Sequence, residues 1–481
     1  MSVAVGERVG GARVEVGDDL LERLGGVCTV ETADDVRAEH GRDWWPLALR
    51  WNLAGDVAAL PAVVARPAST VEVAAVLALC HEARVPVTPA AGRSGVCGGA
   101  VPVHGGVALD LLGLGGVTSV DDASLVVETG AGTNGAELES ALRDGHGLTL
   151  GHRPQSLALS TVGGWLACRS AGQYSTRYGK IEDMVVGLEV ALADGRVIHT
   201  GGRAPRAATG PDLTQVFVGS EGTLGVITAA ALRVRPVPPA ERRAAFGFTT
   251  FAEGLDACRR ILRRGATPAV LRLYDPVESA RVFGLSHRNV LIVLDEAEPR
   301  LADAVLHLVG EECAGAERLD DALVDRWLAG RDDVSALGVL VAEGVTVDTC
   351  EVAARWSALP AVHAAALAAL ASVEGTLVAS AHQSHAYPDG ACVYLTFAGR
   401  RDEGDSYYLD AWDAVVGAVL EAGGTLAHHH GVGLNRARFL PRALGPAFAT
   451  LVDLKSALDP RGVLNPGKLG LPSPWGAPAW P

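Results

Sequence analysis

The sequence lacks the features that mark several special classes of protein. Its formal net charge is −15, so it lacks the surplus of basic residues that a nucleic-acid binder or a polybasic membrane anchor needs. No apolar run approaches the roughly 20 residues that cross a bilayer, and the opening MSVAVGERVGG has no signal-peptide core. The eight cysteines include no C-x-x-C pair, which favours free thiols in a reducing compartment over disulfides. We therefore expect a cytoplasmic protein without a transmembrane segment.

With 481 residues, the chain is too long for one hydrophobic core and should form at least two domains. Pro236, Pro238 and Pro239 mark the exit from the first domain. Strands and helices then alternate as far as ACVYLTFAG (391–399), which is typical of an α+β domain with an antiparallel sheet. The expected divisions are an N-terminal segment (1–56), a first domain (57–238), a second domain (239–430), a C-terminal segment (431–470) and a loosely ordered Pro-rich tail (471–481).

Three local patterns predict individual elements of the first domain. Thr70 stands where a helix N-cap belongs. MVVGLEVALADGRVIHTG (184–201) predicts a hairpin around an Asp-Gly turn. NGAELESALRDGHG (134–147) predicts a helix that ends at Gly145 or Gly147.

Two glycine-rich stretches are candidates for binding a nucleotide. GAGTNG (130–135) has the G-x-G-x-x-G form, but no acidic residue follows at the distance that a Rossmann site requires, so a tight strand-to-helix turn is favoured. PAAGRSGVCGG (89–99) follows a short apolar strand. Such a loop can turn several backbone N–H groups toward a pyrophosphate, or it can be an ordinary glycine-rich turn.

Three further stretches favour the pyrophosphate interpretation. GHRPQSLALSTVGGW (151–165), CRSAGQYSTRYGKIED (168–183) and GSEGTLGVIT (219–228) follow the first loop in this order. Together they resemble the vanillyl-alcohol oxidase / p-cresol methylhydroxylase (PCMH) superfamily of FAD-binding flavoproteins. With HHHGVG (428–433) added, the chain is more similar to the alkyldihydroxyacetonephosphate synthase branch, from about Ala58 to Gly470.

The resemblance implies a two-domain α+β fold, in which a PCMH-type FAD-binding domain (57–238) is completed by residues 431–470. The antiparallel-sheet domain (239–430) would be the cap that carries the substrate site. The implied FAD-binding residues are Pro89, Ala90, Ala91, Gly92, Arg93, Ser94, Gly95, Gln155, Ser156, Leu157, Ala158, Leu159, Ser160, Thr161, Cys168, Arg169, Ser170, Ala171, Glu221, Gly222, Thr223, Leu224, Gly225, Val226 and Ile227. Ser94 and Leu159 occupy the positions where covalent relatives link the flavin through histidine or cysteine, so the FAD should be noncovalent.

The resemblance also assigns catalytic residues. Tyr394, in GACVYLTFAG, takes the position of an acid–base tyrosine, although a strand tyrosine is more often a packing residue. Arg272, in VLRLYD, takes the position of an arginine needed for activity, and an ion pair with Asp275 is the structural alternative. Arg331 is the nearest match to a substrate-contacting arginine. His382 and His385 receive no role from the resemblance.

His428, His429 and His430 form the third candidate group. If they are extended, His428 and His430 face one way and His429 the other. That geometry offers two local ligands where a metal site needs three or four, so we expect no metal. Because histidine titrates near neutral pH, we expect these residues to act in acid–base catalysis.

The resemblance thus implies a transferase of ether lipid synthesis. It would exchange the acyl group of acyl-dihydroxyacetone phosphate for a long-chain alcohol through an adduct at flavin N5. The alternative is an FAD-linked oxidase or dehydrogenase of a 2-hydroxy acid or another small alcohol, although the H-x-G-D-G-N-x-H and Glu-His-Gly motifs of those enzymes are absent. A non-enzymatic flavin-binding role ranks last.

The expected partner is a small-molecule or lipid-like substrate, and a homodimer stays open. CRRILRRG predicts a helix with one basic face. That face is either a solvated surface or a peripheral contact with an anionic lipid surface; its basic residues are Arg259, Arg260, Arg263 and Arg264.

Overall fold

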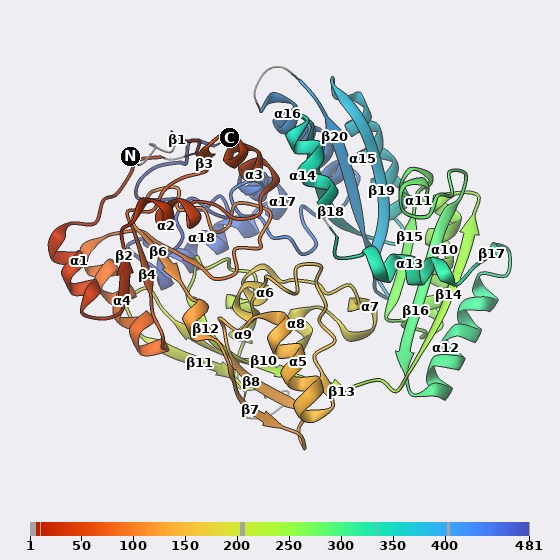
Figure 1. Ribbon diagram of the computed structural model, residues 1–481, viewed down its shortest axis with the longest axis horizontal. Helices are drawn as coiled ribbons and strands as arrows, with labels where there is room; N and C mark the ends of the chain where they lie inside the picture. The colour runs from red at the N-terminus through yellow and green to blue at the C-terminus, as the bar shows by residue number, and fades with distance from the viewer. Residues whose placement is uncertain (1–5, 10, 203–206, 334, 402–404, 481) are drawn as a thin grey trace.

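The computed structural model describes residues 6–9, 11–202, 207–333, 335–401 and 405–480. The first five residues of the N-terminal segment and the last residue of the tail lie outside this range. The described residues form two parts (Figure 1). The first contains a four-stranded sheet, a five-stranded sheet and two two-stranded sheets (β1-β3 and β13-β9), and the second contains one seven-stranded sheet. The α+β fold with an antiparallel cap sheet, as predicted, is confirmed.

A four-stranded sheet, in the order β2-β4-β6-β5, forms the start of the first part. Strands β4, β6 and β5 run parallel, and β2 joins antiparallel. The elements are β1 (Gly6–Glu7), α1 (Asp18–Gly25), β2 (Thr29–Glu31), α2 (Asp34–Glu39), α3 (Pro46–Leu53), β3 (Asp56–Val57), β4 (Val63–Arg66), α4 (Thr70–Ala83), β5 (Val87–Ala90), β6 (Val107–Asp110) and the 3-10 turn η1 (Leu112–Leu114). The N-cap of α4 is Ser69, whose side chain accepts a hydrogen bond from the Glu72 N–H. The prediction of Thr70 was one residue late.

An antiparallel five-stranded sheet, β11-β10-β12-β8-β7, follows. Its elements are β7 (Val117–Asp121), β8 (Val126–Gly130), α5 (Gly135–His146), β9 (Leu148–Thr149), α6 (Val162–Cys168), α7 (Ser175–Tyr178), α8 (Ile181–Met184), β10 (Val185–Ala191), β11 (Val197–Gly201), α9 (Thr214–Phe217), β12 (Val226–Arg233) and β13 (Arg235–Pro236). The predicted hairpin is β10–β11. GAGTNG is a turn whose Asn134 caps α5, and Gly147 ends that helix in the left-handed conformation.

The cap contains a seven-stranded antiparallel sheet, β17-β14-β16-β15-β19-β20-β18, at the right of Figure 1. Its elements are β14 (Ala240–Phe248), α10 (Phe251–Arg263), β15 (Val270–Tyr274), α11 (Pro276–Phe283), β16 (Asn289–Ala297), α12 (Pro299–Glu312), β17 (Glu317–Leu319), α13 (Ala322–Gly330), α14 (Ser335–Ala342), β18 (Thr346–Arg355), α15 (Leu359–Ser372), β19 (Thr376–Ala386), β20 (Gly390–Gly399) and α16 (Ser406–Glu421).

Both faces of the cap sheet are buried. Because side chains alternate along a strand, Leu271 and Leu273 of β15 join the core under α10, α12 and α15. Val270 and Tyr274 of the same strand join a second core with α7, α11 and α13. The first part, with α11 and α13, therefore packs against one face of the cap sheet, and α10, α12 and α15 cover the other.

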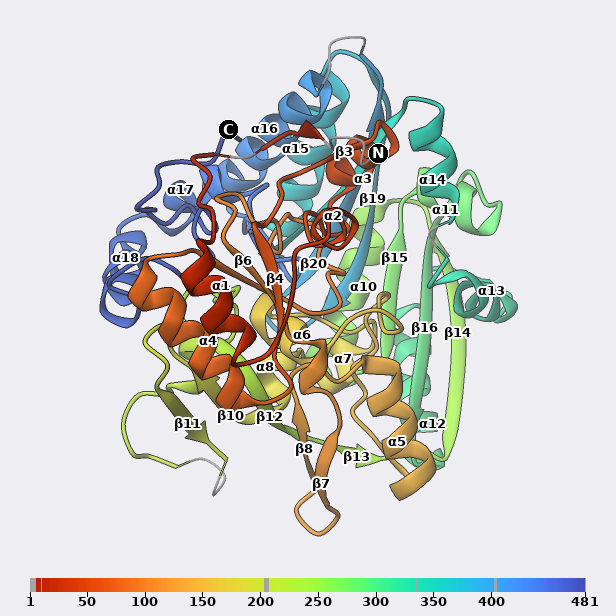
Figure 2. The ribbon, with the colours of Figure 1, turned by 60° about the vertical axis from the view of Figure 1, so that its left-hand side comes forward.

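The C-terminal segment returns to the first part (Figure 2), where Arg461, just after α18, donates to the backbone carbonyls of His81 and Glu82 in α4. Its elements are the 3-10 turn η2 (Ala437–Phe439), α17 (Leu440–Leu444) and α18 (Ala447–Leu458). Leu464 pairs with Val87 of β5, and the Asn465 side-chain amide donates to the backbone carbonyls of Gly99 and Glu221.

The Pro-rich tail is docked rather than loose, which corrects the sequence-based expectation. The ring of Trp480 lies edge-on to Trp45 and Trp51, with ring centroids 5.0 and 5.8 Å away, and Leu471 is buried. Two tryptophans in a stretch of proline and glycine were the sign that this segment has apolar surface to bury.

Three of the four arginines on the basic face of α10 form ion pairs within the fold. Arg260 pairs with Asp256 and Glu312, Arg264 pairs with Glu311 and Glu312, and Arg259 pairs with Asp256. This arrangement fits the solvated helix face rather than an anionic lipid contact. None of the helices in the described part of the chain is long and apolar enough to cross a bilayer.

Candidate active site

A row of polar side chains crosses the cap sheet on the face that meets the first part. In the strand register, Glu351 of β18 lies opposite Tyr394 of β20, which lies opposite His382 of β19. His382 in turn lies opposite Tyr274 of β15. Directly opposed residues share a face, so three ladders align these four side chains, and Arg272 joins them two residues from Tyr274.

A bulge in β19 adds His385 to the row. The register shifts between Gln383 and His385, so that His385 lies opposite Cys392. In a regular strand, residue 384 would share the face of His382; the extra residue gives that place to His385 instead. The sequence pattern gave no sign of this shift.

The histidine segment is folded around a buried carboxylate. Glu351 Oε1 accepts hydrogen bonds from the backbone N–H groups of His428, His429 and His430, at 3.2, 3.0 and 2.8 Å. Its Oε2 pairs with the buried guanidinium of Arg436 and lies 3.2 Å from His430 Nδ1. The three residues are therefore bent rather than extended, and the expected alternation of their side chains is wrong.

The side chains of His429 and His430 both reach the hydroxyl of Tyr394. The Tyr394 hydroxyl lies 2.6 Å from His429 Nε2 and 3.4 Å from His430 Nε2. The ring of His382 stacks on the other side of Tyr394, with centroids 4.9 Å apart and an interplanar angle of 8°. The structure thus brings together three of the predicted catalytic residues, Tyr394, His429 and His430, with the unassigned His382.

Burial sets the protonation of this cluster. Burial raises the pKa of Tyr394 well above its usual value. Burial, reinforced by the neighbouring histidines, lowers the pKa of His429 well below its usual value. Burial alone would raise the pKa of Glu351, but the neighbouring Arg436 and His430 hold that pKa well below the usual range. Near neutral pH, Tyr394 and His429 are neutral and Glu351 is charged.

Three histidine side chains converge, although the sequence offered only two ligands locally. One ring nitrogen from each of His385, His428 and His429 lies within 4.8 Å of the others, so the geometric premise of the metal-free expectation is wrong. The ring nitrogens also have hydrogen-bond partners: His428 Nδ1 and His429 Nδ1 face each other at 2.9 Å, and Ser175 Oγ lies 2.7 Å from His385 Nδ1.

Arg272 and Arg331 lie against the same aromatic ring. Their guanidinium carbons are 5.3 and 5.5 Å from the centroid of Trp327. Arg272 Nη2 lies 2.9 Å from His382 Nε2, and Arg331 Nη1 donates to the Tyr174 hydroxyl at 2.9 Å. The ion pair between Arg272 and Asp275 is not formed. Asp275 instead caps α11, accepting from the Glu278 N–H at 2.8 Å.

The four predicted FAD loops converge at one place beside the histidine segment. A Cβ on Gly92 would lie 2.1 Å from the Leu159 carbonyl oxygen, and one on Gly222 would lie 2.5 Å from Pro89. The Glu221 carboxylate accepts the backbone N–H groups of Val432 and Gly433, at 2.6 and 2.7 Å. Close backbone contacts therefore join loops that are far apart in sequence.

These loops carry strained backbone and unpartnered polar groups. Arg93, Arg169 and Glu221 adopt φ values of 47, 55 and 49°, in the left-handed region that side chains disfavour and functional sites retain. The buried Thr161 Oγ1 and Arg93 Nη1 find no hydrogen-bond partner among the described residues. A glycine-lined surface with spare donors fits a phosphate-containing cofactor such as FAD.

Sequence reasoning missed His152 in the second loop. Both of its ring nitrogens are buried without a hydrogen-bond partner in the described part of the chain, and burial lowers its pKa to about 3. Buried polar atoms normally have partners, so the His152 side chain is a candidate contact for a bound molecule. No sequence pattern distinguishes it.

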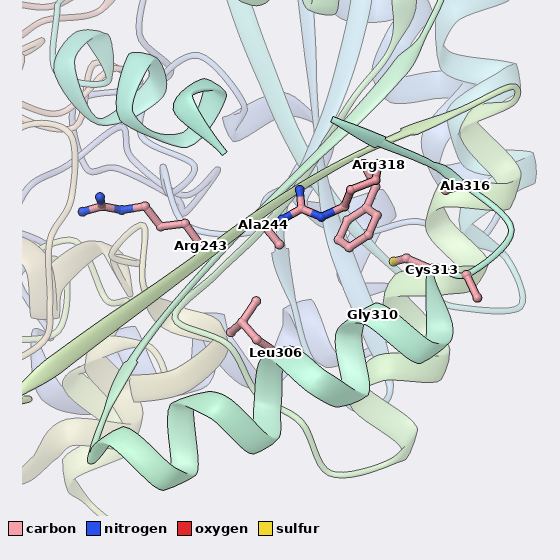
Figure 3. Close-up of a pocket in the computed structure, with 9 residues that line it drawn as sticks. Arg243, Ala244, Leu306, Gly310, Cys313, Ala316 and Arg318 are labelled. Atoms are coloured by element: carbon pink, nitrogen blue, oxygen red, sulfur yellow. The ribbon is translucent and has the colours of Figure 1, made fainter. Parts of the chain in front are cut away.

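A cavity of about 340 Å³ lies elsewhere, at the opposite edge of the cap sheet (Figure 3). It is lined by β14, β17 and α12, and its arginines Arg243 and Arg318 are paired with Glu241, Asp325 and Asp321. Three strands, β16, β15 and β19, separate β14 from β20 and Tyr394. This cavity contributes no residue to the Tyr394 cluster.

Both parts of the chain are similar to known FAD-dependent proteins. Residues 61–201 match the "FAD binding domain" family, and residues 237–469 match "FAD linked oxidases, C-terminal domain". An uncharacterized FAD-linked oxidoreductase of Escherichia coli, YgcU, is 31% identical and covers 85% of this chain and 89% of its own. Alkyldihydroxyacetonephosphate synthase of Dictyostelium discoideum is 29% identical (86% and 74% coverage), and glycolate oxidase subunit GlcD of Bacillus subtilis is 28% identical (94% and 96%).

Solved structures share the fold. A structure of alkyldihydroxyacetonephosphate synthase superposes with a TM-score of 0.77 at 24% identity, covering 97% of this chain and 90% of the other. p-Cresol methylhydroxylase with substrate bound gives a TM-score of 0.77 at 17% identity, with 96% and 99% coverage. FAD is the cofactor that these two domain families bind, and the chain belongs to the family of FAD-linked oxidases.

Proposed function

We propose that this protein is an FAD-dependent transferase of the alkyldihydroxyacetonephosphate synthase type. It would exchange the acyl group of acyl-dihydroxyacetone phosphate for a long-chain alcohol. The observation that carries the proposal is the Tyr394 hydroxyl held between His429 and His430 over the buried Glu351. Bound FAD would supply an electron acceptor beside the reacting carbon.

Tyr394 has the contacts of an acid–base group. An acyl-for-alkyl exchange removes a substrate proton and returns one, so it needs a group that both accepts and donates. A neutral phenol hydrogen-bonded to a neutral imidazole can do both. Glu351 fixes the histidine segment through three backbone hydrogen bonds, which holds His429 Nε2 at the phenol.

Arg272 and Arg331 supply the positive charge for an anionic substrate. Arg272 is buried, and it has no carboxylate partner among the described residues. Arg331 Nε lies 3.8 Å from Asp332 Oδ2, which is a long ion pair. Two guanidiniums against one ring match the planar, bidentate recognition of phosphate, the group that the proposed substrate carries.

The FAD would be bound noncovalently in the converging loops. Ser94 and Leu159 offer neither an imidazole nor a thiol at the two linkage positions, and Leu159 is 46% exposed on the surface of the loops. Acid precipitation of the yellow protein should release all of its FAD intact into the supernatant. Colour that stays in the washed pellet would contradict noncovalent binding.

Oxidation of a small alcohol or hydroxy acid is the second candidate. It is favoured by the 31% identity to an FAD-linked oxidoreductase and the 28% identity to a glycolate oxidase subunit. The same tyrosine and arginines could take a hydroxyl proton and hold a carboxylate. The two functions differ in one respect: oxidation leaves the FAD reduced after turnover, whereas the exchange is redox-neutral overall.

That difference defines the test. The holoenzyme is incubated without oxygen with palmitoyl-dihydroxyacetone phosphate and hexadecanol, and the products are identified by mass spectrometry. The proposal predicts hexadecyl-dihydroxyacetone phosphate and free palmitate in equal amounts, with the 450-nm flavin absorbance restored at the end. Lasting bleaching by glycolate or D-lactate, with no ether product, would replace the transferase by an oxidoreductase.

A further inference from the structure

The hydrogen bonds of Tyr394 continue beyond His429. His429 Nδ1 lies 2.9 Å from His428 Nδ1, and His428 Nε2 lies 3.1 Å from the Tyr387 hydroxyl. The Tyr387 hydroxyl lies 3.2 Å from Ser175 Oγ, which lies 2.7 Å from His385 Nδ1. A single unbroken series of polar groups therefore runs from the phenol of Tyr394 to the imidazole of His385.

We propose that Tyr387 and Ser175 complete a proton relay that carries the proton handled by Tyr394 through His429 and His428 to His385. The inference rests on the proposed acid–base role of Tyr394. The relay adds Tyr387 and Ser175, which transfer a proton without contacting the substrate. It also gives a role to His385, which has none in the proposed reaction.

Every group in the relay can pass a proton on. Each neutral imidazole accepts at one ring nitrogen and donates from the other, and a hydroxyl does both through its oxygen. As the Tyr394 proton moves to His429 Nε2, the proton on His429 Nδ1 moves to His428 Nδ1. The proton on His428 Nε2 then moves to the Tyr387 oxygen, that of Tyr387 to Ser175 Oγ, and that of Ser175 to His385 Nδ1.

In total, one proton moves from Tyr394 to His385, and no electrons are transferred. Tyr394 loses its proton and can take one from the substrate, while His385 becomes an imidazolium. Burial lowers the pKa of His385 well below its usual value, so the imidazolium is a transient store. The same hydrogen bonds in reverse order return the proton, which suits an exchange that removes a proton and gives one back.

The relay crosses the interface between the two parts of the molecule. Ser175 opens α7 of the first part, whereas His385 lies at the end of β19 in the cap and Tyr387 directly follows that strand. Ser175 and His385 are 1% and 3% exposed, so bulk water does not compete for their hydrogen bonds. Lys180 Nζ donates to the His428 carbonyl at 2.7 Å, which fixes the middle of the relay from the first part.

The test removes one hydroxyl from the middle of the relay. Tyr387→Phe separates His428 from Ser175 and leaves the ring in place, and Ser175→Ala breaks the next link. Tyr178→Phe is the matched control, because the Tyr178 hydroxyl also joins the two parts, donating to Glu296 Oε1 at 2.5 Å, but lies outside the relay. FAD content and melting temperature identify properly folded variants.

The first measurement is ¹⁵N NMR of the histidine rings in the holoenzyme, with His429 assigned by the loss of its signals in His429→Asn. Tyr387→Phe and Ser175→Ala should change the protonated nitrogen or tautomer balance of His429, which touches neither residue, and Tyr178→Phe should not. A role in local packing would leave His429 unchanged. An unchanged His429 in Tyr387→Phe would overturn the relay.

The second measurement is turnover in the exchange assay. Tyr387→Phe should lower kcat about tenfold or more, within the range of acid–base effects, and leave KM close to that of the wild type. An unchanged kcat would also overturn the relay. If the wild type shows no exchange while His429 still responds to Tyr387→Phe, the proposed transferase activity fails and the coupled relay stands.

Discussion

The two faces of the cap sheet are built from alternate residues of the same strands, but one face is apolar and the other carries the polar side chains of the candidate active site. On β20, Leu395 and Phe397 join the apolar core under α15 and α16, while Tyr394 faces the histidine segment. One face holds the cap together by excluding water. On the other face, the side chains of Glu351 and Arg436 are 0% exposed. An unpaired buried charge strongly destabilises the folded state, so each of these two charges needs the other as its partner.

Along each strand of the cap sheet, the residues that stabilise the fold therefore alternate with those of the candidate active site. Apolar side chains can be replaced singly, at the cost of a cavity. The polar face is a connected set, because Glu351 holds three backbone N–H groups, one histidine ring and one guanidinium. A change at Glu351 should therefore reach Tyr394, whereas a change at Leu395 should not.

Glu351→Gln is expected to have the largest effect. Glutamine keeps an acceptor for the backbone N–H groups but leaves the buried Arg436 uncompensated, which costs about 3–5 kcal/mol when a buried pair is broken. The free energy of unfolding, measured with urea, should fall by that order, and turnover should be lost.

The matched control is Glu312→Gln on the exposed edge of α12, where Glu312 pairs with Arg260 and Arg264. Exposed ion pairs contribute little, so stability and turnover should stay near those of the wild type. If the two variants behave alike, the carboxylate of Glu351 does not organise the polar face.

Leu395→Ala tests the apolar face of the same strand. Removing a buried leucine side chain should lower the free energy of unfolding by about 2–5 kcal/mol. At a temperature where the variant stays folded, kcat should remain within a few fold of the wild type. A collapse of kcat with FAD still bound would show that the two faces are not separable.

A pH titration gives the smallest expected effect. His363 stacks on Phe251 with ring centroids 4.2 Å apart, and burial lowers its pKa to about 4. The unfolded chain therefore binds a proton below the usual pKa of about 6.5, while the native state does not until about pH 4. His363 contributes stability above pH 6.5 that is lost as the pH falls toward 4, at up to about 1.4 kcal/mol per pH unit.

The measurement for His363 compares urea unfolding of the wild type and His363→Gln between pH 7 and 4. The difference in stability should shift in favour of the variant as the pH falls. A constant difference across this range would mean that the imidazole titrates normally in the native state.

Contiguous motifs predicted the loops that we propose to hold the cofactor. PAAGRSGVCGG, STVGGW and GSEGTLGVIT each lie in one loop, and the structure brings the loops together through Gly92 and Gly222. The resemblance indicated Arg272 and Arg331, which are 59 positions apart in the sequence and lie against the same ring of Trp327. The resemblance named Tyr394 and the three histidines, but it did not give their geometry.

The rest of the site depends on pairings that a sequence does not display. Glu351 is one acidic residue among 56, and only the register of β18 with β20 places it opposite Tyr394. His385 faces the site because of a bulge in β19. The alternation expected for residues 428–430 failed for the same reason: their backbone N–H groups bond to a distant carboxylate instead of to a neighbouring strand.

The most direct test of the account is the turnover of Tyr394→Phe in the exchange assay. The variant keeps the ring between His382 and the histidine segment and removes only the hydroxyl. We expect full FAD content, an unchanged melting temperature and a kcat lower by about 10²–10⁴, the usual scale of general acid–base catalysis. A Tyr394→Phe enzyme that makes the ether product at a rate near that of the wild type would reduce Tyr394 to a packing residue and contradict the central claim.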